Sequence, residues 1–284
     1  MIRLLRALQA RLKEAGLPEG EAWDLLALAT GLSRKDLLLR LAEPPPEGAE
    51  ERAWALLQKR LSRYPLQYLL GEVEFFGLPL KVAEGVLIPR PETEGLVALA
   101  LALPLPPRPR ILDVGTGTGA IALALKRHLP EAEVFATEVD EKALRLAEEN
   151  ARRLGLAVRF LKAPLTGGLK GLDLVVANPP YLPEAYREAA PPELAYENPL
   201  ALYAGEEGLA VAWPLALEAE RALRPGGFLL LELAPENVHR LGEALRERGF
   251  EAEVLRDLAG RDRYLRARRP PKEPVGEEGP LRGP

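Results

Sequence analysis

The feature that most constrains the fold is an apolar segment that two prolines bring to an end. Residues 172–177 read LDLVVA, and Asn178, Pro179, Pro180 and Tyr181 follow directly. A segment of this length, β-branched toward its end and stopped by proline, is typical of a buried parallel strand. Asn178 is therefore predicted at the carboxyl end of a strand, the edge of an open α/β sheet where ligands bind. An Asn-Pro pair alone indicates a plain turn at least as strongly, so its meaning depends on the rest of the chain.

A glycine turn, DVGTGTG at residues 113–119, lies upstream between a predicted strand at 110–114 and a predicted helix at 120–129. Glycines let the backbone approach a ligand closely, and the amide end of the following helix favours negative or polar groups. The next predicted strand ends at Glu138, nineteen residues after Gly119, where a carboxylate can accept hydrogen bonds from both ribose hydroxyls. The pattern predicts a nucleoside site formed by Asp113, Gly115, Thr116, Gly117, Thr118, Gly119 and Glu138.

The glycine turn does not identify the nucleoside, because Gly115, Gly117 and Ala120 also satisfy the dinucleotide fingerprint. The Asn-Pro-Pro-Tyr sequence favours methyl transfer to a planar NH2 group over hydride transfer. The lone pair of such a nitrogen is delocalised, so the nitrogen attacks poorly unless both N–H bonds are held. The side-chain oxygen of Asn178 and the carbonyl of Pro179 can be the two acceptors, since proline fixes the direction of its own carbonyl.

This reasoning predicts S-adenosylmethionine as the cofactor and assigns roles at the strand end. The aromatic ring of Tyr181 can stack on a flat acceptor group. The predicted catalytic residues are Asn178, Pro179 and Tyr181, with Asn178 also beside the cofactor; the predicted substrate-binding residues are Asn178, Pro179, Pro180, Tyr181 and Arg90.

Periodicity and proline placement divide the chain into four parts. Residues 1–64 form a small helical domain, residues 65–88 a β-hairpin connector, residues 89–268 the catalytic domain, and residues 269–284 a tail predicted to be disordered. The third part alternates strand and helix in the manner of a doubly wound sheet and closes with an antiparallel edge hairpin. The helical domain carries no cluster of polar residues suited to catalysis, so it is either a packing cap or a docking surface for a partner. We expect docking, because a separate helical domain needs a reason to be attached.

Three further predictions concern a hairpin turn, a helix cap and one arginine. The hairpin turn is predicted at residues 77–79, where glycine and proline fall together. Thr93 or Glu92 is expected to cap a helix that runs to about residue 103. Arg90 can either pair with a carboxylate or face a ligand, and the sequence favours neither.

Composition excludes several classes of function. The chain has 284 residues, a formal net charge of −4, no cysteine and two histidines. Disulfides, thiolate zinc sites and cysteine nucleophiles are therefore excluded, and no metal is predicted. No overall basic field would gather nucleic acid, so no direct nucleic-acid partner is expected. No membrane association is expected either, because the sequence contains no 18-residue apolar span and does not open as a signal peptide; a cytoplasmic location is predicted.

Five segments together resemble a known family. GEVEFFGLPLKV, VLIPRPETE, DVGTGTGAIALAL, NPPY and DLAGRDR, spread over about residues 65–268, are similar to the protein-glutamine N5-methyltransferases of peptide chain release factors, the HemK/PrmC family. The resemblance implies a class I methyltransferase domain, Rossmann-like with a mostly parallel seven-stranded sheet, behind a helical domain that docks the release factor. It implies S-adenosylmethionine as donor and the glutamine of a Gly-Gly-Gln loop as acceptor. Residues 115–119 and Glu138 would then hold the donor, and residues 178–181 the glutamine amide.

The chain departs from the family pattern at two places. Residues 162–164 read Lys-Ala-Pro where the family often has an acidic residue for the adenine, and residues 231–236 lack the usual glycine and glutamine. Two alternatives also stay open. A nucleic-acid amino-methyltransferase would use Asn-Pro-Pro-Tyr on adenine N6 or guanine N2, and a nicotinamide-dependent oxidoreductase would use the glycine turn.

Overall fold

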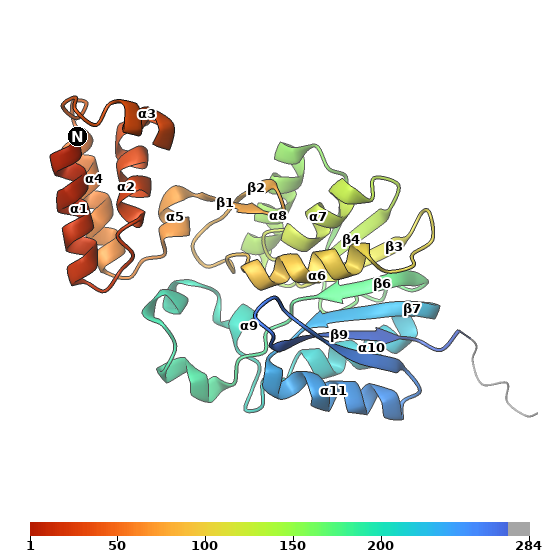
Figure 1. Cartoon of the computed structure of the whole chain (residues 1–284). Coiled ribbons are helices and arrows are strands. Elements are labelled where there is room, and N and C mark those ends of the chain that lie inside the picture. The colour runs from red at the N-terminus through yellow and green to blue at the C-terminus, as the bar shows by residue number, and fades with distance from the viewer. Residues whose placement is uncertain (272–284) are drawn as a thin grey trace, which may run out of the picture. The chain divides into compact units, whose positions relative to one another are not determined.

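The computed structural model describes residues 1–271, which form two compact units (Figure 1). The first unit, here called the helical unit, consists of residues 1–73, 82–85 and 191–196. The second unit consists, among the described residues, of 74–81, 86–190 and 197–271. Most of the predicted disordered tail, residues 272–284, lies outside the described residues. The predicted four-part division of the chain stays a prediction.

The helical unit is built on leucines that recur at helical spacing. Its helices are α1 (Ile2–Glu14), α2 (Glu21–Thr30), α3 (Arg34–Leu39), α4 (Ala49–Leu61) and α5 (Leu66–Leu70). Leu8, Leu12, Leu25 and Leu57 are among the fully buried side chains of its core, as the apolar periodicity requires. Ser33 caps α3, because the amide of Asp36 donates to Ser33 Oγ at 3.1 Å.

A short 3₁₀ helix from far along the chain belongs to the helical unit. It is η2 (Pro192–Tyr196), and its Glu193 accepts from Arg60 Nη1 at 3.2 Å and from Arg63 Nη1 at 3.4 Å. Arg60 is buried and also makes a two-pronged contact with Glu21, at 3.0 and 3.2 Å. This network joins η2 to the helices through charges that are all partnered.

The second unit is organised by a seven-stranded sheet in the order β5-β4-β3-β6-β7-β9-β8. The strands from β5 to β7 are parallel, and β9 pairs antiparallel with both β7 and β8. The mostly parallel sheet and its antiparallel edge hairpin are thus confirmed. All six residues of β6 are buried, which is why the strand is apolar at every position except Asp173. The strands are β3 (Arg110–Val114), β4 (Glu133–Glu138), β5 (Arg159–Lys162), β6 (Leu172–Ala177), β7 (Leu223–Glu232), β8 (Glu251–Arg256) and β9 (Asp262–Arg268).

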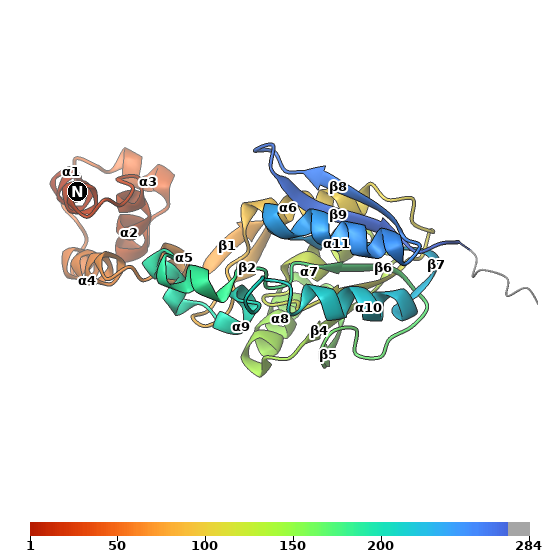
Figure 2. The ribbon, with the colours of Figure 1, turned by 90° about the horizontal axis from the view of Figure 1, so that it is seen from below.

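Helices cover both faces of this sheet. The right-handed crossovers from β3 to β4 and from β4 to β5 place α7 (Ala120–His128) and α8 (Glu141–Leu154) on one face. The strand order reverses after β5, so α10 (Ala212–Ala222) and α11 (Pro235–Glu247) cover the other face, and α11 lies along β8 and β9 (Figure 2). Before the first strand of this sheet, α6 (Pro91–Leu101) packs on α7 and β7. Between β6 and α10 lie η1 (Glu184–Glu188), η2 and α9 (Pro199–Leu202).

The predicted hairpin exists, but its turn was misplaced. Strands β1 (Glu72–Phe75) and β2 (Leu78–Lys81) form a separate two-stranded sheet, so Pro79 lies within a strand. The turn is Phe76-Gly77, with φ of 47° and 77°, the left-handed pair that two-residue hairpins use. Proline is tolerated in β2 because every strand of a two-stranded sheet is an edge strand.

One smaller difference concerns a helix. Neither Glu92 nor Thr93 caps α6, whose amino end makes no side-chain cap bond. Within the described part of the chain, no helix is both long enough and apolar enough to cross a bilayer.

Candidate active site

A pocket lies where β3, β4 and β6 end, and we call it the carboxyl-edge pocket. The register pairs Val114 with both Thr137 and Ala177, so the three strands end level with one another. Because they are parallel, the segments that follow them meet at one edge of the sheet. The lining includes the predicted residues Gly115, Gly117, Glu138, Asn178, Pro179 and Pro180. It also includes a largely apolar set, Val86, Leu87, Val139, Ala163, Leu165, Leu200 and Val211.

The glycines of the turn have two structural roles, one in backbone conformation and one in helix packing. Gly115 and Gly117 have φ of 68° and 58°, and an added Cβ at either would meet no atom within 4 Å. Their glycine is needed for the left-handed backbone, and the space beside them is open to the pocket. An added Cβ at Gly119 would instead lie 3.0 Å from the Leu123 side chain and 3.3 Å from Ala147 Cβ. Gly119 therefore serves the packing of α7 and α8.

Glu138 is fixed by backbone amides. Its Oε1 accepts from the Gly117 amide at 2.9 Å, and its Oε2 accepts from the amides of Val139 and Asp140 at 2.9 and 3.1 Å. These three bonds tie the end of β4 to the glycine turn. The carboxylate is thereby held in the pocket wall with lone pairs left for a ligand.

Asp113 lies beneath the turn and does not line the pocket. Its Oδ2 accepts from the Thr116 hydroxyl at 2.7 Å and from the Ala122 amide at 3.2 Å, which joins the turn to the first residues of α7. Complete burial raises its pKa to about 7. Thr116 and Thr118 are also buried. Four of the residues predicted at the cofactor thus support the turn on the side away from the pocket and do not line it: Asp113, Thr116, Thr118 and Gly119.

Asn178 follows β6, as predicted, and one end of its side chain is unpaired. Its Nδ2 donates to Thr93 Oγ1 at 3.3 Å, whereas its buried Oδ1 has no hydrogen-bond partner. A buried acceptor left unpaired costs free energy, so the oxygen is placed to accept from a bound group.

Tyr181 lies beside the pocket and remains a neutral phenol at neutral pH. Burial, together with the negative charge of Glu232, raises its pKa to about 12. Arg263 Nη1 donates weakly to its hydroxyl at 3.5 Å. Tyr181 therefore offers a flat ring and a hydroxyl, and not a base.

Arg90 makes an ion pair, the first of the two possibilities that the sequence left open. Its Nη2 and Nη1 donate to the two carboxylate oxygens of Glu197 at 2.6 and 3.0 Å, and the Ile88 amide donates to the same carboxylate at 2.8 Å. Glu197 is buried. The pair braces the segment around Ile88 against the start of α9, and both segments supply lining residues of the carboxyl-edge pocket. A role for Arg90 in binding the substrate stays a prediction.

Sequence reasoning missed two polar residues next to Asn178. Thr93, expected as a helix cap, is buried in the first turn of α6 and donates to Glu232 Oε1 at 3.0 Å. Glu232 ends β7, is fully buried, and has its pKa raised to about 7 by that burial. The available signal was a single carboxylate within the apolar segment at 228–233, where an acid is out of place unless it has a partner.

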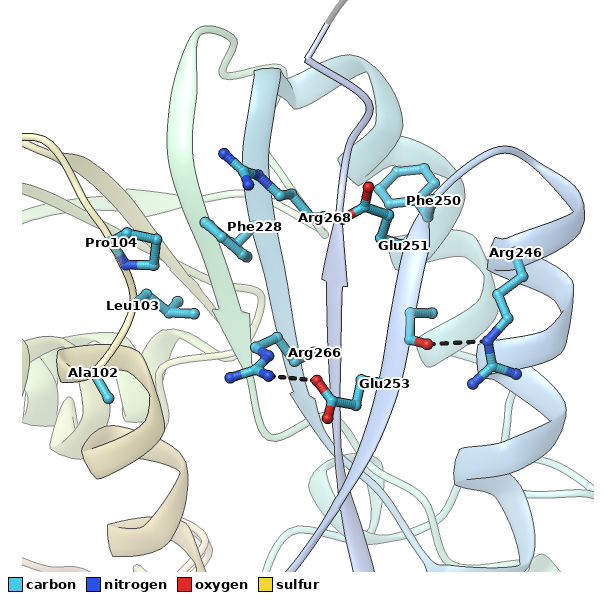
Figure 3. Close-up of a pocket in the computed structure, with 11 residues that line it drawn as sticks. Ala102, Leu103, Pro104, Phe228, Arg246, Phe250, Glu251, Glu253, Arg266 and Arg268 are labelled. Carbon is cyan, nitrogen blue, oxygen red and sulfur yellow. Dashed lines mark hydrogen bonds and ion pairs between the residues drawn. The ribbon is translucent and has the colours of Figure 1, made fainter.

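A second cavity lies at the opposite end of the strands and contains none of the predicted site residues (Figure 3). Phe228, near the other end of the β7 ladder from Glu232, forms part of its wall, with Leu103 and Pro104. Its arginines have protein partners: Arg266 pairs with Glu253, and Arg246 donates to the Ala252 carbonyl at 3.0 Å (Figure 3). Across the described residues, no group of three or more acidic, histidine or cysteine side chains could hold a metal ion.

Comparison with known proteins gives consistent matches along the chain. Residues 3–71 match the family model described as PrmC N-terminal domain, and residues 93–191 match the one described as methyltransferase small domain. The chain is 52% identical to a release factor glutamine methyltransferase of Deinococcus radiodurans, over 94% of this chain and 97% of that protein. It is 42% identical to the protein of the same name from Moorella thermoacetica, over 89% and 92%. A methyltransferase structure from Pyrococcus furiosus, 22% identical, aligns with a TM-score of 0.55 over 78% of this chain and 99% of that one, which shows a shared fold.

Proposed function

The chain belongs to the family of release factor glutamine methyltransferases, and we propose that it carries out its methyl transfer in the carboxyl-edge pocket, at Asn178. Family membership favours the first of the three functions that the sequence left open. The proposed donor is S-adenosylmethionine, and the proposed acceptor is the side-chain nitrogen N5 of the glutamine in a release factor's Gly-Gly-Gln loop. The cytoplasmic location stays a prediction.

The β3 and β4 side of the pocket suits the donor. Glu138 is held by three backbone amides with acceptor capacity to spare for the two ribose hydroxyls. Gly115 and Gly117 leave open space beside their backbone. Apolar residues, among them Val139, Ala163 and Leu165, offer a surface for a flat base in place of the acidic contact that the sequence lacks. When bound, S-adenosylmethionine supplies an electrophilic methyl group on a positively charged sulfur.

The end of β6 suits the acceptor amide. Asn178 Oδ1 is buried and unpaired, so it can accept one N–H of the glutamine side chain. The carbonyl of Pro179 is proposed to accept the other N–H, and Tyr181 to pack its ring on the amide plane. Holding both N–H bonds directs the nitrogen lone pair toward the methyl group. The nitrogen would form its bond to the methyl carbon as the carbon–sulfur bond of the donor breaks, with the bonding electron pair staying on the sulfur, which leaves as an uncharged thioether. The alkylated nitrogen would then lose one proton to water, and because that proton is strongly acidic, no strong base is needed.

The single observation that carries this proposal is the unpaired, buried Asn178 Oδ1 at the edge of the sheet where the carboxyl-edge pocket opens. The test is to incubate the purified chain with S-adenosylmethionine and a release factor, and then map methylation by peptide mass spectrometry. We expect one methyl group, on the glutamine of the Gly-Gly-Gln loop. A release factor with that glutamine replaced by alanine is the control and should stay unmodified. Methyl transfer to RNA or to another residue, with that glutamine untouched, would overturn the proposal.

The helical unit is proposed to dock the release factor. It presents exposed leucines on α2 and α3, of which Leu39 is 75% and Leu38 is 57% exposed. Apolar side chains left in water at this fraction are suited to burial against a protein partner. The release factor would then be recognised by a surface separate from the residues that hold the glutamine.

A further inference from the structure

The orientation of the Asn178 side-chain amide decides whether the pocket can hold an acceptor NH2 group. A primary amide has a donor end and an acceptor end of nearly the same shape, so rotation by half a turn exchanges them. In the structure the nitrogen faces Thr93 and the unpaired oxygen is the other end. With the amide reversed, two N–H donors would face the N–H donors of the glutamine, and the pocket would repel its substrate.

Thr93 alone does not determine this orientation. Its hydroxyl has one hydrogen and two lone pairs, so it can accept from Asn178 Nδ2 or donate to Asn178 Oδ1 with similar ease. The hydroxyl hydrogen, however, is committed to Glu232 Oε1 at 3.0 Å. Only lone pairs are left to face Asn178, and they match the nitrogen end at 3.3 Å. A carboxyl group can accept this bond whether or not its other oxygen carries a proton.

The fold holds Thr93 and Glu232 together although 139 positions separate them in the sequence. Glu232 is opposite Tyr264 in the β7–β9 ladder, and the Tyr264 hydroxyl donates to the Glu92 carbonyl at 2.6 Å. At Gly95, one turn along α6, an added Cβ would come within 2.3 Å of the same hydroxyl oxygen. The amino end of α6 is therefore pressed onto β7 and β9, and this contact brings Thr93 to the carboxyl group.

We propose that Thr93 and Glu232 are positioning residues that fix the Asn178 amide with its nitrogen inward and its oxygen toward the acceptor nitrogen. The hydrogen bonds run in one direction, from Asn178 to Thr93 and from Thr93 to Glu232. Both Thr93 and Glu232 are buried, so water does not compete for these bonds. The inference rests on the proposed function, since it explains how Asn178 would hold the glutamine.

The test is single-turnover methylation of a release factor at saturating donor and acceptor, in the full-length protein. Thr93→Val keeps the side-chain volume and removes the hydroxyl, and we expect it to lower the rate about five- to tenfold, the usual worth of one neutral hydrogen bond. Donor affinity should not change. Thr93→Ser restores the hydroxyl and should recover most of the rate. A merely structural role would lower thermal stability and donor binding together with the rate.

Glu232→Gln is the second variant to test. A glutamine side chain can either accept a hydrogen bond from Thr93 or donate one to it, so the Thr93 hydroxyl is no longer required to act as the donor. We expect a smaller loss of rate than in Thr93→Val, and we expect the double variant to be no slower than Thr93→Val alone. Such non-additivity shows that the two residues act through one chain of bonds. Thr166→Val is the matched control, because Thr166 is also buried and donates to a glutamate, Glu218, at 3.0 Å, but the partner of Asn178 Nδ2 is Thr93 and not Thr166.

The outcomes separate this inference from the function on which it rests. If Asn178→Ala abolishes methylation while Thr93→Val and Glu232→Gln keep the wild-type rate, the positioning role is wrong and the proposed site stands. Additive losses in the double variant would also overturn the positioning role. If Asn178→Ala itself methylates at the wild-type rate, the proposed site is wrong.

Discussion

On the β3 and β4 side of the carboxyl-edge pocket, Glu138 is held by three backbone amides, one in the glycine turn and two directly after β4. On the β6 side, Asn178 is held by Thr93 of α6, which in turn depends on Glu232 of β7. On the first side both carboxylate oxygens of Glu138 have hydrogen-bond partners in the protein, whereas the second side leaves Asn178 Oδ1 and Glu232 Oε2 without one. The difference suits a site that holds one ligand by preformed backbone geometry and captures the other by side chains.

One atom does not follow this division. Asp113 Oδ1, under the glycine turn, is also buried and unpaired. Its other oxygen is the one that joins the turn to α7. The residue is closed off from the pocket, so its unpaired oxygen differs from that of Asn178, which is at the pocket lining. An unpaired buried atom is thus informative about ligands only where it faces space that a ligand can enter.

The largest expected effect tests the β6 side. Asn178→Ala removes one of two proposed acceptors for the glutamine N–H bonds, and turnover should fall by roughly 10²–10³, by analogy with deleting one preorganised oxyanion-hole donor. Donor affinity should barely change, since the donor is assigned to the other side. Single-turnover methylation and calorimetric titration of the donor measure the two quantities. Equal losses in both would mean that the two sides are not separable.

Asn178→Asp sharpens the same test. The carboxylate keeps an acceptor oxygen, and its charge would stabilise the positively charged donor in the ground state, a stabilisation that fades as the charge is lost in the transition state. Turnover should fall between that of the wild type and that of Asn178→Ala. Donor binding should be equal or tighter. An aspartate variant slower than the alanine variant would contradict this ordering.

The next effect tests the β4 side. Glu138→Ala removes the proposed ribose contact, and the donor dissociation constant should rise about 10- to 100-fold, corresponding to about 1.5–3 kcal/mol for hydrogen bonds to a charged group. Glu141→Ala is the matched control, because Glu141 is three residues away and forms an exposed ion pair with Arg145 at 2.7 Å. Calorimetry with S-adenosylmethionine measures both. Unchanged donor affinity in a folded Glu138 variant would remove the ribose assignment.

A smaller effect, on KM for the release factor, is expected from substitutions in the helical unit, which lies outside the pocket. Leu38→Ser with Leu39→Ser should raise KM for an intact release factor about three- to tenfold, since burying a leucine fully is worth about 1.5–3 kcal/mol and only part of it would be covered. KM for a short Gly-Gly-Gln peptide should stay the same. Leu258→Ser is the control, because Leu258 is fully exposed in the second unit. Equal changes with protein and peptide would contradict docking by these leucines.

The sequence was sufficient for the β3 and β4 side because that side is local. A strand, a glycine turn and a second strand ending in an acid follow one another within residues 110–138, and their hydrogen bonds join neighbours in this stretch. The apolar run of β6, interrupted only by Asp173, likewise placed Asn178 at a strand end, because most positions of a strand buried on both faces must be apolar. Features of this kind can be predicted because the interactions that cause them join residues close together in the sequence.

The Thr93–Glu232 bond was not predictable, because it depends on contacts between distant segments. Nothing near Thr93 indicates a carboxyl group that comes 139 positions later, and the register of Glu232 with Tyr264 is set only when β9 pairs with β7. The misplaced hairpin turn has a different cause. Gly77 was recognised, but Phe76 at φ 47° takes the other left-handed position, which a phenylalanine rarely occupies and a sequence pattern does not assign to it.

The last prediction compares the two sides of the pocket through their buried acids, Asp113 and Glu232. Burial raises the pKa of Asp113 and of Glu232 to about 7, so each holds a proton in the folded protein at a pH where the unfolded chain, with a pKa near 4, has released it. The contribution of each to stability is therefore fully present below about pH 4 and is lost as the pH rises through about 7. The free energy of unfolding should fall between about pH 5 and pH 8, and the fall should be smaller in Glu232→Gln, which no longer titrates. Chemical denaturation at constant ionic strength measures it, with Glu236→Gln, an exposed acid on α11, as the variant that should parallel the wild type. If Glu232→Gln also parallels the wild type, Glu232 does not bind the extra proton on folding, and the pH dependence belongs to the β3 side alone.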